Sequence, residues 1–211
     1  MEQKNYNKDI IDEMREGPKS WMNFLIIGVN ILIFLLVEAT GSSEDPSHMI
    51  SWGAADTALI QAGEYYRLFT CMFLHFGLEH LLNNMLLLFF TGYYLERFVG
   101  KACYLILYLG GGLIGSLCSW AVEMAGEESV VSAGASGAIF AVLGALIVTV
   151  WCRRGQEENL SMRRLMLMVL LSVYVGFRSA GVDNAAHIGG LVGGVILALP
   201  VTYFKKRGNT V

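Results

Sequence analysis

Six long apolar stretches dominate the chain and leave little of it for anything else. They cover residues 21–38, 77–95, 102–122, 135–152, 165–181 and 185–204. Each is long enough to cross a bilayer, because a helix needs roughly 17–25 residues to span the hydrocarbon core. The composition agrees, with 55% hydrophobic and only 16% charged residues. We therefore expect an all-α membrane protein, a bundle of six transmembrane helices over residues 21–204, between a polar tail (1–20) and a basic tail (205–211).

The positive charges predict the orientation of these helices. Six spans place both termini on one side, and all of the 15 Lys and Arg residues except Arg67 and Arg178 fall on that side. Because positive residues collect on the cytoplasmic side, both termini should be cytoplasmic. The acidic residues before the first stretch favour an uncleaved signal anchor over cleavage near 37–39. A net charge of −3 without a basic cluster gives no sign of a nucleic-acid partner.

Uncommon polar side chains gather at one end of the second, fourth and sixth stretches. In the alternating topology these three stretches all enter from the outside, so the polar residues should lie at one depth. They are His75, His80, Asn83, Asn84, Ser136, Asn184 and His187. Ionisable groups inside membrane spans are expensive and indicate function. We expect a site at this outer end of the bundle.

The residue types in this group fit peptide hydrolysis by a serine. A serine hydroxyl needs a base to become a nucleophile, so we assign Ser136 as nucleophile and His187 as its base. His80 and Asn84 are four residues apart and share a helix face, from which both could stabilise an oxyanion together with the backbone N–H of Ser136. The glycines beside Ser136 permit a tight turn and the close approach of a substrate strand.

Small residues predict how the histidine reaches the serine. Gly137 and Ala141 have small-xxx-small spacing in the fourth stretch, and Gly190 and Gly194 have it in the sixth. Such faces let helices approach closely in lipid. We expect close contact between these two helices, which would bring Ser136 near His187.

Three motifs resemble those of the rhomboid intramembrane serine proteases over about residues 60–200. They are the turn Gly134-Ala135-Ser136-Gly137, the run from Ala186 to Gly194, which resembles Ala-His-x-x-Gly-x-x-x-Gly, and the run from His75 to Asn84. The resemblance implies a bacterial-type six-helix core and a Ser136–His187 dyad with no third acid. It also implies that His80 and Asn84 support the oxyanion, and that substrate helices enter laterally between the second and fifth spans.

Four positions need separate interpretation. Tyr66 stands where the family commonly has Trp before Arg, and Phe140 stands where a Tyr often stacks on the catalytic histidine. A Phe can still stack. Asp183 could be proposed as a third catalytic residue, but we expect it to cap the sixth helix. Glu96 resembles a motif residue at the cytoplasmic end of the second span, and we expect a structural role.

The resemblance also defines the expected partners and the alternatives. Substrates should be single-span membrane proteins, and no metal or other cofactor is expected. The location should be the plasma (inner) membrane, with the site open to the extracytoplasmic side.

One alternative is an inactive rhomboid-like protein that binds clients, and a second is a small transporter. A third is a metalloprotease with His75, His80 and His187 as ligands, although the chain has no His-Glu-x-x-His motif. The four cysteines show no metal-ligand spacing and are expected to fill helix contacts.

Overall fold

The computed structural model describes residues 19–126, 130–152, 166–167, 169–171, 174 and 181–208, with backbone alone for 203–208. Five long helices make up most of it: α2 (Trp21–Thr40), α6 (Gly77–Val99), α7 (Lys101–Glu123), α8 (Ser136–Cys152) and α10 (Asn184–Gly208). They coincide with five of the predicted apolar stretches. The remaining predicted stretch, 165–181, lies largely outside the described residues, and residues 1–18 lie wholly outside them.

Several of these helices have the length and composition of membrane spans. Within the described residues, α2, α7 and the part of α10 from Asn184 to Thr202 meet both conditions, and α8 is a shorter apolar helix of 17 residues. Helix α6 meets them together with the short helices before it, across a bend of 88°. Leucines on α6 repeat every fourth residue and stay exposed, namely Leu78, Leu82 and Leu86. Such apolar stripes face lipid, so the chain is an integral membrane protein.

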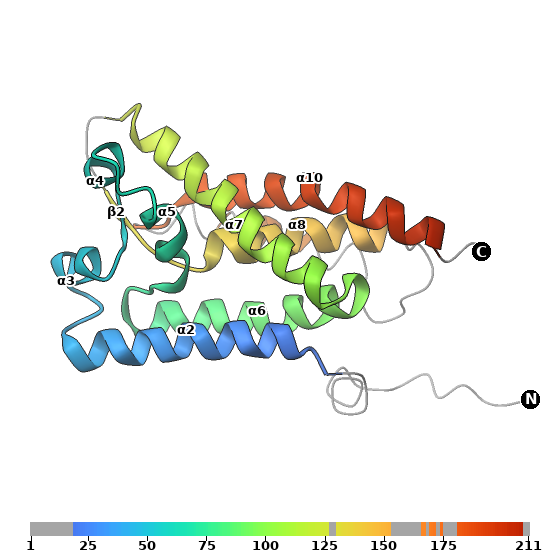
Figure 1. Ribbon diagram of the computed structural model, residues 1–211, viewed down its shortest axis with the longest axis horizontal. Helices are drawn as coiled ribbons and strands as arrows, with labels where there is room; N and C mark the ends of the chain where they lie inside the picture. Colours follow the sequence, from blue (N-terminus) through green and yellow to red (C-terminus); the bar gives the residue numbers. More distant parts are fainter. Residues whose placement is uncertain are drawn as a thin grey trace, which may run out of the picture.

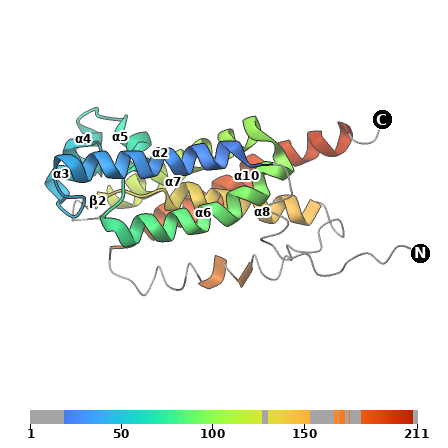
Figure 2. The same cartoon turned by 90° about the horizontal axis from the view of Figure 1, so that it is seen from below.

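Helix α8 forms the centre of the bundle. Nearly all of its side chains from Gly137 to Thr149 are buried, and α6, α7 and α10 all pack against it. Helices α2 and α6 form a layer on one side, and α7, α8 and α10 lie on the other (Figures 1 and 2). A helix that is apolar on every face needs this central place.

The backbones of α8 and α10 are in direct contact at two glycines. A Cβ at Gly190 would overlap the carbonyl oxygen of Gly137, and one at Gly194 would overlap that of Ala141. Glycine is the residue that fits at both positions, because any side chain there would push the helices apart. The predicted close contact between these two helices is confirmed.

The connection between α2 and α6 folds into short elements at one end of the bundle (Figure 1). These are α3 (Pro46–Ser51), β1 (Ala55–Asp56), α4 (Thr57–Gln61), α5 (Arg67–Thr70) and the 3-10 helix η1 (Cys71–Phe73). Strand β1 pairs antiparallel with β2 (Val131–Ser132), with Ala55 opposite Ser132. This pairing ties the connection to the segment that leads into α8.

Arg67 holds this connection together from inside. Its side chain is only 5% exposed, and its guanidinium donates to the carbonyl oxygens of Ile50 at 2.7 Å and Ala54 at 2.9 Å. Its Nε donates to Glu64 at 2.8 Å. The hydroxyl of Tyr66 also donates to Glu64, at 2.7 Å, and these two bonds lower the pKa of the Glu64 carboxyl. Tyr66 is thus joined to the same cluster.

Glu96 has the structural role that the sequence predicts. It is buried near the end of α6, where its carboxylate accepts the backbone N–H groups of Met22 at 3.2 Å and Asn23 at 2.8 Å. These amides belong to the first turn of α2 and have no partner inside that helix. The Tyr104 hydroxyl donates to the Asn23 side chain at 2.7 Å, so α6 and α7 together fix the start of α2.

Candidate active site

The candidate site lies where α6, α8 and α10 begin, at the end of the bundle that also holds the α2–α6 connection (Figure 1). Ser136 is the first residue of α8, and His187 lies in the first turn of α10. His80 and Asn84 occupy the first two turns of α6. All four predicted site residues therefore come to the same end of the molecule from three different helices.

The backbone just before Ser136 is held by η1 and by the segment between η1 and α6. The Gly134 N–H donates to the carbonyl oxygen of Cys71 at 3.0 Å. The next amide, that of Ala135, donates to Nε2 of His75 at 3.4 Å. Two consecutive amides are thus bound from one side, which fixes the turn that presents Ser136.

Gly134 separates the His80 ring from the Ser136 hydroxyl. A Cβ on Gly134 would lie 3.0 Å from Nε2 of His80 and 3.6 Å from Oγ of Ser136. The same residue has a φ of 153°, a conformation that favours glycine. A side chain here would therefore intrude between His80 and Ser136.

His187 packs against α8 one turn beyond Ser136. Its ring stacks on Phe140, with centroids 4.3 Å apart and planes 9° from parallel, as the sequence predicts for this pair. A Cβ on Gly137 would touch the carbonyl oxygen of Ala186 at 3.4 Å. The residue after Ser136 therefore faces the residue before His187, and the two candidate residues lie on facing first turns. The His187 side chain is 8% exposed, and its Nδ1 has no hydrogen-bond partner among the described residues.

Asp183 is engaged elsewhere. Its Oδ1 accepts the backbone N–H of Ala186 at 2.8 Å, the geometry of an N-cap on α10. Its Oδ2 accepts the hydroxyls of Ser119 at 2.5 Å and Ser132 at 2.7 Å. The expectation that this residue caps the helix is confirmed, and both carboxylate oxygens are occupied without His187.

The polar side chains of Asn84 and His75 are buried. Asn84 is 7% exposed, and its Nδ2 is a buried donor without a partner in the described part of the chain. An unused buried donor is costly and marks a place where a ligand atom would bind well. His75 is 1% exposed, so it belongs to the interior of the molecule.

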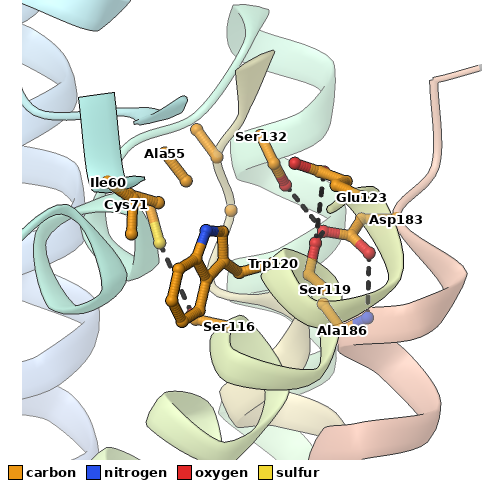
Figure 3. Close-up of a pocket in the computed structure, with 12 residues that line it drawn as sticks. Ala55, Ile60, Cys71, Ser116, Ser119, Trp120, Glu123, Ser132, Asp183 and Ala186 are labelled. Atoms are coloured by element: carbon orange, nitrogen blue, oxygen red, sulfur yellow. Dashed lines mark hydrogen bonds between the residues drawn. The ribbon is translucent and has the colours of Figure 1, made fainter. Parts of the chain in front are cut away.

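A small pocket adjoins the turn before Ser136 (Figure 3). Its lining includes Gly134 and Ala186, which flank the candidate residues, and the polar group of Ser119, Glu123 and Asp183. Glu123 accepts the Thr57 hydroxyl at 2.5 Å, so the group also binds the start of α4.

Sequence reasoning did not single out Ser119, Ser132 or Thr57. Their only sequence signal was the acidic residues close to the Gly-Ala-Ser-Gly turn.

No group of three or more His, Cys, Asp or Glu side chains among the described residues could hold a metal ion.

The fold and the site together define a polytopic helical membrane protein with polar residues of three helices meeting at one end of the bundle. The family model described as Rhomboid domain matches residues 62–204. The chain belongs to the rhomboid family.

Several curated relatives are similar to this chain. Rhomboid protease GluP of Bacillus subtilis (strain 168) is 36% identical over 183 residues, which are 87% of this chain and 35% of GluP. YdcA of the same organism is 34% identical over 69% of this chain and 71% of its own length. RHOMBOID-like protein 5 of Arabidopsis thaliana is 39% identical over 74% of this chain and 50% of its own length. The chain thus spans about a third of GluP and half of the Arabidopsis protein.

Proposed function

We propose that this chain is an intramembrane serine endopeptidase that hydrolyses peptide bonds in or near the transmembrane helices of membrane proteins. The observation that carries the proposal is the meeting of Ser136, His187, His80 and Asn84 at one end of three helices. Unrelated packing residues have no reason to collect there. The relatives that are named proteases support the same class of reaction.

The dyad acts through one ring nitrogen of His187. Its Nδ1 is buried without a partner among the described residues, so Nε2 is the nitrogen that takes the proton from Oγ of Ser136. The freed oxygen attacks the peptide carbonyl and forms a tetrahedral intermediate. Proton transfer from His187 to the leaving nitrogen then breaks the C–N bond, and a serine ester remains. His187 then takes a proton from water, and the resulting hydroxide hydrolyses the ester. The same proton passes from His187 to Oγ of Ser136.

The oxyanion of this intermediate binds between α6 and α8. The unused Nδ2 donor of Asn84, a ring N–H of His80 and the backbone N–H of Ser136 are the candidate donors. The His80 ring and Oγ of Ser136 both lie beside Gly134. Asp183 takes no part in proton transfer, because the backbone and two serines occupy its oxygens.

The substrates that fit this site are single-span membrane proteins cut near one membrane boundary. We place the site on the extracytoplasmic side of a plasma (inner) membrane, with both termini in the cytoplasm, because Lys and Arg collect at the opposite side. The lipid bilayer is the other partner, because it holds both this protein and its substrates. No nucleic acid or metal enters this scheme.

The decisive experiment compares purified wild-type protein with Ser136→Ala on a model single-span substrate in proteoliposomes. Cleavage by the wild type alone is expected. A fluorophosphonate probe should label the wild type and leave Ser136→Ala unlabelled. Cleavage by both proteins would assign the reaction to another nucleophile. Binding of the substrate by both without cleavage or labelling would favour the inactive client-binding protein.

A further inference from the structure

His75 touches two parts of the proposed machinery at once. It lies between η1 and α6, is almost fully buried, and accepts the backbone N–H of Ala135 through Nε2 at 3.4 Å. Its ring also packs edge-on against the ring of His80, with centroids 5.2 Å apart and planes at 72°. One side chain thus contacts both the turn of the nucleophile and a candidate oxyanion donor.

The contact with Ala135 decides where the His75 ring carries its proton. An amide N–H can donate only to a nitrogen with a free lone pair, so Nε2 is unprotonated. A neutral imidazole has one N–H, which must then be on Nδ1. That nitrogen is buried without a partner among the described residues. Protonation of both nitrogens would set two N–H groups against each other at Ala135 and break this contact.

The Ala135 amide has few other ways to be satisfied. Ala135 is fully buried and lies one residue before the first residue of α8. The amides at the start of a helix have no partner within it. The Ala135 carbonyl oxygen already accepts the N–H of Ile139 in the first turn. Hence the His75 acceptor fixes the peptide plane from which α8, and Ser136 with it, begins.

We propose that His75 is a positioning residue which, as a neutral imidazole protonated on Nδ1, holds the Ala135 amide and so fixes Ser136 relative to His80. The role rests on the proposed function, because it acts through the nucleophile and the oxyanion donor. His75 itself touches neither substrate nor reacting atoms. It needs only a lone pair at the position of Nε2 and a flat group against His80.

Three substitutions separate the acceptor from the shape of the ring. The amide of a glutamine reaches about as far as Nε2 of histidine, so His75→Gln retains an acceptor there. His75→Asn places its amide near Nδ1, and His75→Phe retains the flat ring without an acceptor. We expect His75→Gln to keep kcat within about threefold. The other two should lose about 10- to 100-fold in kcat with KM unchanged, because small displacements of reacting groups have effects of this size. Equal kcat in the Phe and Gln variants would overturn the proposal.

A spectroscopic measurement tests the same idea without relying on activity. The chain has only four histidines, so ¹⁵N-histidine spectra of Ser136→Ala in detergent can be assigned by comparison with the His75→Gln double variant. The His75 signals should show the proton on Nδ1 and an unprotonated Nε2. A proton on Nε2 would overturn the proposal whatever the cleavage rates of the variants. Absence of cleavage and of probe labelling in the wild type would instead remove the proposed function, while the tautomer would still decide the hydrogen bond.

Discussion

The ring of Phe140 lies almost parallel to the imidazole of His187, 4.3 Å from it. The two residues come from helices that enter the site separately, so this stack fixes the plane of the histidine relative to α8. We expect Phe140→Leu, which retains apolar volume and loses the flat surface, to lower kcat about 3- to 10-fold. Stacked aromatic pairs contribute about 0.5–1.5 kcal/mol beyond burial, which corresponds to this range. Initial rates on a model substrate measure the effect. Phe140→Tyr is the control and should stay near the wild-type rate. Equal rates in the two variants would show that the stack does not position the His187 ring.

Asp183 offers a test between capping and catalysis. Asp183→Ala removes the N-cap of α10, leaves the Ser132 hydroxyl without its acceptor, and leaves the Ser119 hydroxyl only its longer bond to Glu123. We expect unfolding to become easier by about 1–3 kcal/mol, with turnover reduced much less than in Ser136→Ala. Asp183→Asn still accepts from Ala186 and should recover part of the stability. Thermal unfolding in detergent and cleavage rates provide the two measurements. A loss of about 10⁴-fold in kcat by a stable Asp183→Asn protein would instead make Asp183 a triad member.

Asn84 provides a test of the oxyanion site. Asn84→Ala removes a buried donor that has no partner within the described residues. We expect kcat to fall about 10²- to 10³-fold, the usual effect of losing one oxyanion donor, and less than in Ser136→Ala. Fluorophosphonate labelling of Ser136 should persist at a reduced rate, because the dyad is intact. A kcat equal to that of Ser136→Ala would contradict the assigned role.

The same substitution at two glycines should have opposite effects. Gly190→Ala would force a Cβ into the carbonyl oxygen of Gly137 and push α10 away from α8. We expect a loss of about 1–3 kcal/mol or more in stability, and with it a loss of cleavage. Gly28 on α2 has nothing within 4 Å of its added Cβ, so Gly28→Ala should be neutral or stabilise by up to about 1 kcal/mol. Thermal unfolding of the two variants side by side measures the difference, and an undisturbed Gly190→Ala protein would contradict the close helix contact.

Arg67 should matter to the α2–α6 connection through geometry more than through charge. Its guanidinium binds the carbonyl oxygens of Ile50 and Ala54 together. Arg67→Lys retains the charge but lacks the planar fork, so we expect a lower unfolding temperature and faster proteolysis of this connection. Tyr66→Phe removes only an exposed hydrogen bond to Glu64 and is the matched control. Equal proteolysis of the two variants would show that the fork is not needed.

Local patterns predicted five of the long helices and the place of the candidate site better than the contacts that support them. The apolar stretches and the motifs around Ser136 and His187 are continuous in sequence, so periodicity and spacing were enough to find them. The bond from Thr57 to Glu123 joins residues 66 positions apart. No local signal pairs such residues, because the bond depends on how β1 meets β2. For the same reason, no local signal pairs His75 with the Ala135 amide, 60 positions further along the chain.

The glycine contacts between α8 and α10 also set an alignment along the membrane. Gly190 meets Gly137, and Gly194 meets Ala141, one helical turn further on. A shift that brought Leu191 and Val195 to these two positions would set side chains against the carbonyl oxygens, whereas the opposite shift would bring Gly189 and Gly193 there. A slide by a whole turn of about 5.4 Å would carry His187 past Phe140. The glycine contacts therefore limit the slide of α10 in one direction, and they hold the turn that carries His187 against the turn that carries Ser136.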